Sequence, residues 1–169
     1  TKFLIIERTE GADEQYILVP SVARVMRLAS NSRDQQMLGS EFYVSDLTLP
    51  DPDSLELSFA GEETIGGRAC RWVDATPKAG SEWQYTRARY AVDPADLVIV
   101  RSEFFDAKGL VKVWNLDKVE KIEGVWTPRV QRMTSVRDKV ESTLEIIDIQ
   151  YRVELEDEMF TRSRLERER

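Results

Sequence analysis

The sequence contains no histidine and a single cysteine, Cys70. Without histidine, no Ser-His or Cys-His catalytic pair can form, and the commonest protein ligand of zinc, copper and haem is missing. One cysteine allows neither an internal disulfide nor a cysteine-based metal site. We therefore expect a protein that is not an enzyme and that holds neither a metal ion nor a cofactor.

Long hydrophobic runs and an excess of basic residues are missing too. No run reaches the roughly 18 apolar residues that a membrane-spanning helix needs. Lys and Arg number 24 against 31 Asp and Glu, which gives a formal net charge of −7. This balance argues against non-specific binding to nucleic acid and against simple adhesion to an anionic membrane.

What the chain does contain is typical of a folded domain. It has 169 residues, of which 41% are hydrophobic, with four Trp, five Tyr and six Phe. These large apolar groups are scarce in disordered chains, and the length suits one domain better than two. The chain starts with Thr1, as expected if a signal peptide or another leading segment has been removed.

Runs rich in β-branched and aromatic residues recur along the chain, with turn residues such as Gly66-Gly67 between them. No helical pattern separates the runs, so they predict an antiparallel meander. The predicted strands are 2–8, 15–19, 23–28, 55–65, 68–75, 83–92, 97–105, 110–122, 125–136 and 140–151. Gly61 is interpreted as a bulge or bend. We expect a loop over 31–46, with a short helix near 45–47. After Val153 we expect a short docking helix or turn, and a frayed end at 164–169.

Several predicted strands carry hydrophobic residues on both faces. Two arrangements explain this pattern. In one, the sheet packs helices or loops on one face and another layer on the other. In the second, the sheet wraps as an open barrel around an apolar cavity, with alternate side chains lining it.

The clusters of reactive residue types favour ordinary structural roles. Carboxylates such as Glu62-Glu63 are interpreted as a solvated acidic face, and Cys70 as a small buried hydrophobe. Four arginines on strand faces are expected to pair with carboxylates, or else to hold an anionic head group: Arg87, Arg89, Arg129 and Arg132.

An ordered set of motifs covers nearly the whole chain. The first motifs are 16–20 (YILVP) with 24–27 (RVMR), 38–42 (LGSEF) with 45–47 (SDL), and 61–65 (GEETI) with 67–70 (GRAC). The later motifs are 109–112 (GLVK), 124–128 (GVWTP) with Met133, 143–148 (TLEIID) and 157–161 (DEMFT). Together they resemble the outer-membrane lipoprotein-sorting protein family of the LolA/LolB-like superfamily. Leu38 and Glu41 stand where the family's signature usually has Met and Asp.

The resemblance implies a mainly β (α+β) fold with a strongly curved antiparallel sheet. The sheet would form an incomplete β-barrel, with short helices or loops plugging its concave side. Its apolar hollow would hold the acyl chains of lipids or lipoproteins, and the protein would work in the periplasm with its signal peptide removed. The implied partners are a lipid or acylated lipoprotein and, beyond these, an inner-membrane transporter or an outer-membrane acceptor, but no nucleic acid.

The start of the chain departs from the family pattern. Family members usually begin with a helix and one or two strands before the point that corresponds to Thr1. We expect residues 1–169 to form a single half-barrel domain without these elements. Strand 2–8 would then be an exposed sheet edge through which a homodimer could form.

We predict that hydrophobic side chains from several strands line the cavity, namely Leu57, Phe59, Trp72, Tyr90, Val100, Phe104, Trp114, Val130 and Ile147. The segment 37–47 is the predicted lid, with Met37, Leu38, Phe42 and Leu47 as its apolar residues. The function that follows is a non-enzymatic periplasmic carrier in lipoprotein sorting or lipid transport. The alternative is a protein-interaction module on the same scaffold, either an envelope-stress sensor or an accessory subunit of an exporter.

Overall fold

The computed structural model describes residues 1–6, 8, 14–19, 21, 24–28, 36–47, 51–81 and 83–167. This part of the chain is mainly β, with antiparallel sheets and few helices. It divides into two compact units, one of residues 1–35 with 150–169 and one of residues 36–149. No helix in the described ranges is long and apolar enough to cross a membrane.

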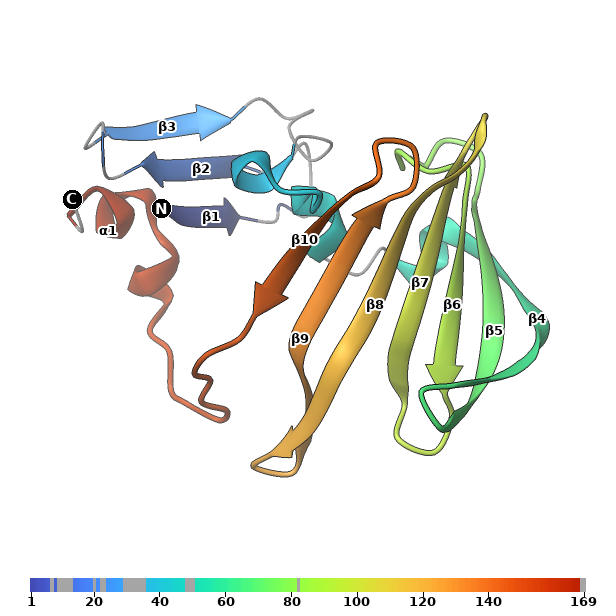
Figure 1. The fold of residues 1–169 in the computed structure, drawn as a ribbon. Helices are drawn as coiled ribbons and strands as arrows, with labels where there is room; N and C mark the ends of the chain where they lie inside the picture. The colour runs from blue at the N-terminus through green and yellow to red at the C-terminus, as the bar shows by residue number, and fades with distance from the viewer. Residues whose placement is uncertain are drawn as a thin grey trace. The chain divides into compact units, whose positions relative to one another are not determined.

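The first unit contains a three-stranded antiparallel sheet in the order β1-β2-β3 (Figure 1). Its strands are β1 (Lys2–Ile6), β2 (Glu14–Val19) and β3 (Arg24–Leu28). The 3-10 turn η6 (Asp157–Phe160) and helix α1 (Arg162–Arg167) belong to the same unit. Leu165 of α1 packs into the core of the sheet, which consists of Leu4, Tyr16, Leu18, Val25 and Leu165.

The second unit contains an open seven-stranded sheet in the order β10-β9-β8-β7-β6-β5-β4 (Figure 1). Each strand pairs with its neighbour in sequence, as expected for a meander. The strands are β4 (Leu55–Ile65), β5 (Arg68–Pro77), β6 (Arg87–Asp93), β7 (Val98–Asp106), β8 (Gly109–Ile122), β9 (Val125–Ser135) and β10 (Val140–Glu145). Three 3-10 turns precede them, namely η3 (Met37–Gly39), η4 (Val44–Leu47) and η5 (Pro52–Ser54).

Local backbone conformation explains where this sheet turns and bends. Gly66 and Gly67 adopt φ of 57° and 81° in the β4–β5 hairpin, a conformation that residues with a Cβ seldom adopt. Gly61 has φ of 114° at a register shift between Phe59 and Glu62, so the predicted bulge is confirmed. Further register shifts occur in the pairings of β6 with β7, β7 with β8 and β8 with β9.

All ten predicted strands are present, but some bounds were wrong. The strand predicted at 83–92 begins at Arg87, and the strand predicted at 140–151 ends at Glu145, because residues 146–150 form no ladder. The predicted frayed end at 164–169 is corrected in part, since Leu165 is only 7% exposed. Residues 31–35 of the predicted loop lie outside the described residues. Strand β1 pairs with β2 alone in the described part of the chain, and the homodimer through its edge stays a prediction.

Leu165 is the side chain of α1 that is buried against the three-stranded sheet. We expect Leu165→Ala to reduce the free energy of unfolding of this unit by about 2 kcal/mol or more, because the change leaves a cavity in the core. Hydrogen exchange of the β1–β3 amides measures the loss. The exposed neighbour Arg164→Ala is the control, and equal exchange in the two variants would contradict the prediction.

Candidate functional site

One face of the seven-stranded sheet is defined by residues that lie opposite one another in register. Leu57 of β4 is opposite Ala75, which is opposite Ala88, and this row continues through Phe104 to Lys112. Residues directly opposite one another in an antiparallel pair point to the same side. We call this side the inner face.

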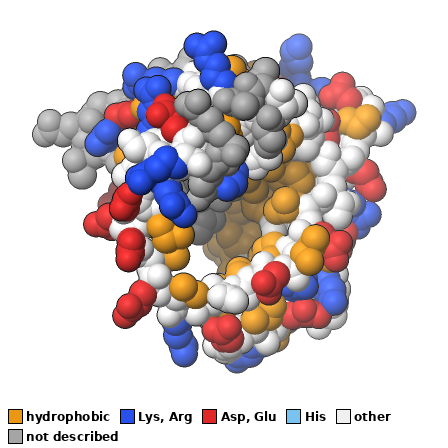
Figure 2. Space-filling model, turned by 90° about the vertical axis from the view of Figure 1, so that its left-hand side faces the viewer, with side chains coloured by type: hydrophobic (Ala, Val, Ile, Leu, Met, Phe, Trp, Pro, Cys, Tyr) orange, Lys and Arg blue, Asp and Glu red, His pale blue; other side chains and the backbone are white. Residues whose placement is uncertain are grey.

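The part of the inner face nearest β4 contains an apolar cavity of about 280 Å³. Strands β4 to β7 supply its walls, and the register places Val73 beside Tyr90 and Val92 beside Ile99. The lining consists entirely of hydrophobic residues and one tyrosine, namely Pro52, Leu55, Leu57, Val73, Tyr90, Val92 and Ile99. Figure 2 shows hydrophobic side chains recessed behind charged side chains of the surface.

The inner face towards β10 is filled by residues 36–47, which we call the plug. Phe42 of the plug is 1% exposed, and its ring meets that of Trp114 edge-on at 6.0 Å between centroids. Phe42 belongs to a buried cluster with Tyr85, which precedes β6, and with three side chains of the sheet, namely Ala88, Phe104 and Met133. The inner face is therefore apolar in two parts, one that lines the cavity and one that the plug covers.

A buried ion pair fixes the plug to the sheet. Lys112 Nζ lies 3.3 Å from Asp46 Oδ2, and the two side chains are 3% and 0% exposed. The same ammonium group donates to the carbonyl of Glu41 at 2.6 Å and sits 3.0 Å from the centroid of the Tyr43 ring. The Tyr85 hydroxyl donates to the second oxygen of Asp46 at 2.8 Å. We call this group the Lys112–Asp46 anchor.

Two effects shift the pKa of Lys112 in opposite directions. Burial lowers the pKa of Lys112, and the carboxylate of Asp46 acts in the opposite direction. A charge this deeply buried is tolerated only where its hydrogen bonds are satisfied. The ring face of Tyr43 and the Glu41 carbonyl meet this need, so the plug supplies most of the partners that Lys112 has.

Further hydrogen bonds connect the plug to β10 and to the segment before β6, and one lies within the plug itself. The Glu41 amide donates to Ser142 Oγ of β10 at 3.0 Å, and Gln84 Nε2 donates to Ser45 Oγ at 2.6 Å. The Tyr43 amide donates to Asp46 Oδ2 at 2.8 Å. Asp46 thus shapes the η4 turn and receives the lysine at the same time.

Five of the nine predicted lining residues lie on the inner face. Leu57 and Tyr90 line the apolar cavity. Phe59 is opposite Val73 of the cavity wall and is 68% exposed. Phe104 and Trp114 pack against the plug cluster instead.

The other four lie elsewhere, which corrects their placement. Trp72 and Val100 belong to a buried cluster on the opposite face of the sheet. Val130 alternates with Gln131, which pairs with Leu144 of the inner face, so Val130 points the other way. Ile147 follows the end of β10 and is 84% exposed. Hydrophobic residues on both faces, together with the unseen register shifts, made the sequence pattern ambiguous at these positions.

Of the four predicted lid residues, two pack against the sheet and two are exposed. Phe42 is buried and Met37 packs against its cluster. Leu38 is 63% exposed and Leu47 is 43% exposed. Sequence reasoning missed Asp46 and Lys112 as a pair, although both lie within the quoted motifs. The available signal was a lysine between Val111 and Val113 in a predicted strand.

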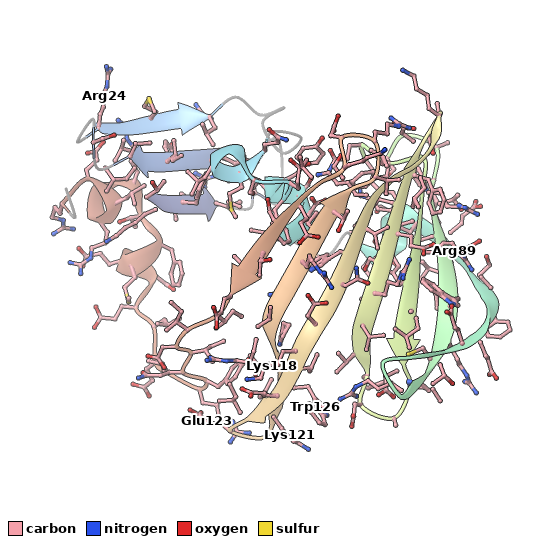
Figure 3. The ribbon with its side chains drawn as sticks, in the orientation of Figure 1. Arg24, Arg89, Lys118, Lys121, Glu123 and Trp126 are labelled. Carbon is pink, nitrogen blue, oxygen red and sulfur yellow. The ribbon has the colours of Figure 1, made fainter. Side chains whose placement is uncertain are left out.

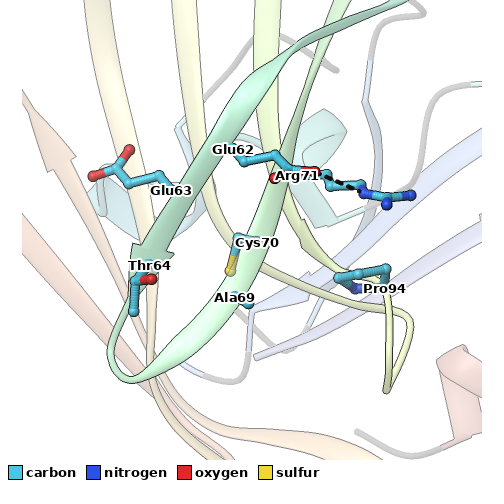
Figure 4. Close-up of a pocket in the computed structure, with 7 residues that line it drawn as sticks. All are labelled: Glu62, Glu63, Thr64, Ala69, Cys70, Arg71 and Pro94. Carbon is cyan, nitrogen blue, oxygen red and sulfur yellow. Dashed lines mark hydrogen bonds and ion pairs between the residues drawn. The ribbon is translucent and has the colours of Figure 1, made fainter.

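A second pocket, of about 400 Å³, lies at the β4–β5 hairpin and has mixed polar lining (Figure 4). Glu62 and Arg71 pair with each other at 3.3 Å, whereas Glu63 points to the other side and accepts from the Trp72 indole at 2.8 Å. Burial raises the pKa of the Cys70 thiol, which disfavours the thiolate that a nucleophile needs. This pocket offers no reactive group.

A third hollow, of about 310 Å³, is lined by residues of the β4–β5 hairpin and of strands β7 and β8. Arg68 of β5 lies over the ring of Trp126, 5.0 Å from its centroid, and donates to Asp93 and Asp96. Figure 3 shows Trp126 near Lys118, Lys121 and Glu123 at the end of the β8–β9 hairpin. The Arg68 guanidinium is already paired with two carboxylates, so it is a structural cross-link between strands.

The expected pairing of the strand-face arginines is confirmed. Arg87 and Arg89 both approach Asp74, at 3.5 and 3.0 Å, and Figure 3 shows Arg89 on the sheet. Arg129 lies 3.5 Å from Glu120, and Arg132 lies 2.7 Å from Asp117. In the described ranges, no group of His, Cys, Asp and Glu side chains could hold a metal ion.

Comparison with known proteins decides the family. A family model described as "-like: Uncharacterized protein" matches residues 1–167. The chain belongs to this uncharacterized protein family. No curated protein matches the sequence of this family member.

Solved structures show what this family member is similar to. A DUF1329 family protein from Desulfovibrio piger has 29% identity and a TM-score of 0.87, with 96% of this chain and 70% of that chain covered. A domain from Vibrio parahaemolyticus, described provisionally as an outer membrane lipoprotein-sorting protein, has 25% identity and a TM-score of 0.85, with 97% and 70% covered. A LolA superfamily protein from Nitrosomonas europaea has 21% identity and a TM-score of 0.67, with 89% and 67% covered, and this likeness concerns the fold alone. The resemblance to lipoprotein-sorting proteins is thereby confirmed.

The anchor can be tested by a double-mutant cycle. We expect Lys112→Met to lower the free energy of unfolding by about 3–5 kcal/mol, because it leaves the Asp46 carboxylate buried without its countercharge. The double variant Lys112→Met/Asp46→Asn removes both charges, keeps an oxygen for the Tyr43 amide and places an NH2 that can donate to the Tyr85 hydroxyl, so most of the loss is recovered. Urea unfolding followed by Trp fluorescence measures both. Equal losses in the single and double variants would show that the charges are not coupled.

Tyr90 gives the cavity a pH dependence. Burial raises the pKa of its phenol from 10.0 to about 12, because the phenolate is poorly solvated there. A pKa raised in the folded state contributes stability that is complete below pH 10 and is lost as the pH rises towards 12. We expect Tyr90→Phe to lose less stability than the wild type between pH 10 and 12 in thermal unfolding, and identical pH profiles would contradict this.

Proposed function

We propose that this chain is a non-enzymatic binding or carrier domain for a lipid or an acylated ligand, acting in the periplasm in outer-membrane lipoprotein sorting or lipid transport. The observation that carries the proposal is the apolar cavity, whose lining offers hydrophobic contact and a single phenol. Such a lining suits a hydrocarbon chain and discriminates little between head groups. The similarity to a domain described as lipoprotein-sorting supports the same ligand class.

The size of the cavity indicates how such a ligand would sit. Its volume of about 280 Å³ is just below the range of roughly 300–1,000 Å³ typical of ligand pockets. Each buried methylene contributes about 0.8 kcal/mol, so six of them give about 5 kcal/mol, a sub-millimolar affinity. The cavity therefore suits a short stretch of chain.

A longer acyl chain needs more of the inner face. The plug covers the adjoining apolar side chains of Phe104, Met133 and Trp114. In our proposal the plug acts as the lid and moves away from these residues, so that the cavity extends along the face towards β10. The open sheet then works as an incomplete barrel, and an inner-membrane transporter or an outer-membrane acceptor completes the transfer.

Leu57→Asp tests this function. Leu57 lines the cavity yet is 55% exposed, so an aspartate there is compatible with folding. We expect the affinity for dansyl-labelled undecanoate to fall by roughly tenfold or more, because the chain would contact a carboxylate. Fluorescence titration measures the affinity, and Ile147→Asp is the matched control because it adds the same charge outside the cavity.

Two outcomes would contradict the proposal. One is the absence of any acyl binding by the wild-type protein in titration and in lipid extraction with native mass spectrometry. The other is equal binding by the Leu57→Asp and Ile147→Asp variants. Recovery of a stable protein partner without lipid would favour the alternative, a protein-interaction module.

A further inference from the structure

The strand β4 forms one edge of the seven-stranded sheet. In the described part of the chain, it pairs with β5 only. It is eleven residues long, and most of its residues are exposed. Long exposed edges offer unpaired N–H and C=O groups to another strand, and many proteins protect them.

The register identifies which backbone groups of β4 face outward. The Lys78 amide donates to the Ser54 carbonyl at 2.9 Å, so the Ser54 carbonyl faces β5 and this position is a hydrogen-bonded one in the ladder. Hydrogen-bonded pairs alternate along an antiparallel ladder. In the register of β4 and β5, the next such pairs are Glu56 with Thr76 and Ser58 with Asp74. The N–H and C=O groups of Leu57 and Phe59 therefore point away from β5.

The same two residues carry exposed hydrophobic side chains. Leu57 is 55% exposed and Phe59 is 68% exposed, and both lie on the inner face beside the apolar cavity. A residue added opposite either of them would place its own side chain on the inner face as well. A residue opposite Glu56 or Ser58 would point to the other face. Alternate residues of an added strand would therefore point to the inner face and to the opposite face.

Charge indicates what the added strand carries on that other face. Residues 51–65 hold five acidic residues and no basic residue, namely Asp51, Asp53, Glu56, Glu62 and Glu63. Glu62 pairs weakly with Arg71 and Glu63 with the Trp72 indole, whereas the Glu56 side chain has no hydrogen bond or ion pair among the described residues. A second copy of β4 would bring a second acidic edge, which these carboxylates repel. A strand that carries basic residues is attracted to them.

We propose that the edge of β4 binds an extended segment of a partner protein in which hydrophobic and basic residues alternate. The segment adds to the sheet by pairing with Leu55–Phe59, where the regular edge ends at the Gly61 bulge. Its hydrophobic side chains lie beside Leu57 and Phe59, and its basic side chains lie beside Glu56. Strand addition of this kind takes its affinity from the backbone and its selectivity from alternate side chains. It goes beyond acyl binding, because it uses the backbone edge instead of the cavity.

The probe is the synthetic peptide Ac-VKVKVKVK-NH2, labelled with a fluorophore and titrated with the full chain. Two control peptides separate the contributions. Ac-KKKKVVVV-NH2 has the same composition and charge without alternation, and Ac-VEVEVEVE-NH2 has the alternation with the opposite charge. We expect both controls to bind at least roughly tenfold more weakly in fluorescence anisotropy.

Variants of the edge test the geometry. Phe59→Pro removes an N–H that points outward and leaves the ladder with β5 intact, as proline on an edge strand requires. We expect it to weaken the alternating basic peptide by roughly tenfold, and Phe59→Ala, which keeps the N–H, to weaken it less. Glu56→Lys, which does not depend on proline being tolerated, is expected to reverse the preference between the basic and the acidic alternating peptides.

Binding of dansyl-labelled undecanoate is measured on Glu56→Lys, whose side chain lies on the face opposite the cavity. Retained acyl binding with a reversed peptide preference separates this inference from the proposed function, and also shows that this variant is folded. The inference is overturned if the alternating peptide does not bind, if the block peptide binds equally well, or if Glu56→Lys leaves the preference unchanged. A dimer of the chain that pairs through β4 would also overturn it.

Discussion

The candidate site depends on one buried ion pair. Lys112 belongs to the sheet and Asp46 to the plug, and neither side chain has contact with water beyond a few per cent of its surface. Two charges in such a place stabilise little by themselves, because desolvation offsets most of their attraction. The pair instead fixes the position of the plug on the sheet. The plug can satisfy Lys112 in one arrangement, with Tyr43 under the ammonium group and Tyr85 on the carboxylate.

The remaining features of the inner face follow from that position. The plug places Phe42 over the half of the sheet that includes Phe104 and Met133, which leaves the half beside β4 uncovered. The empty half is continuous with an exposed edge strand. Our two proposals place two kinds of recognition on one face of a single sheet, hydrophobic burial in the cavity and backbone pairing at the edge, and the two adjoin at Leu57.

The sequence predicted the strands well and the site only in part. Period-two alternation and turn residues such as Gly66-Gly67 are local signals, so the strands and their order follow from short stretches of chain. The face of each side chain is a different matter, because every register shift exchanges the faces for the residues beyond it. Val100 lies at such a shift and was misplaced for that reason, whereas Trp72 lies on a regularly paired strand that has hydrophobic residues on both faces. The Lys112–Asp46 pair joins residues 66 positions apart, and no local pattern indicates such a contact.

The plug is held in place differently from the strands of the β4–β10 meander. Every strand of the sheet is held by its neighbour in sequence, whereas the plug is held by partners as far as 101 positions away, at Ser142. Releasing the plug breaks an ion pair, some hydrogen bonds and aromatic packing, but no strand pairing. Local opening of this segment is therefore a separate event from unfolding of the sheet, with a smaller free-energy cost. The lid movement that we propose therefore requires no break in the sheet.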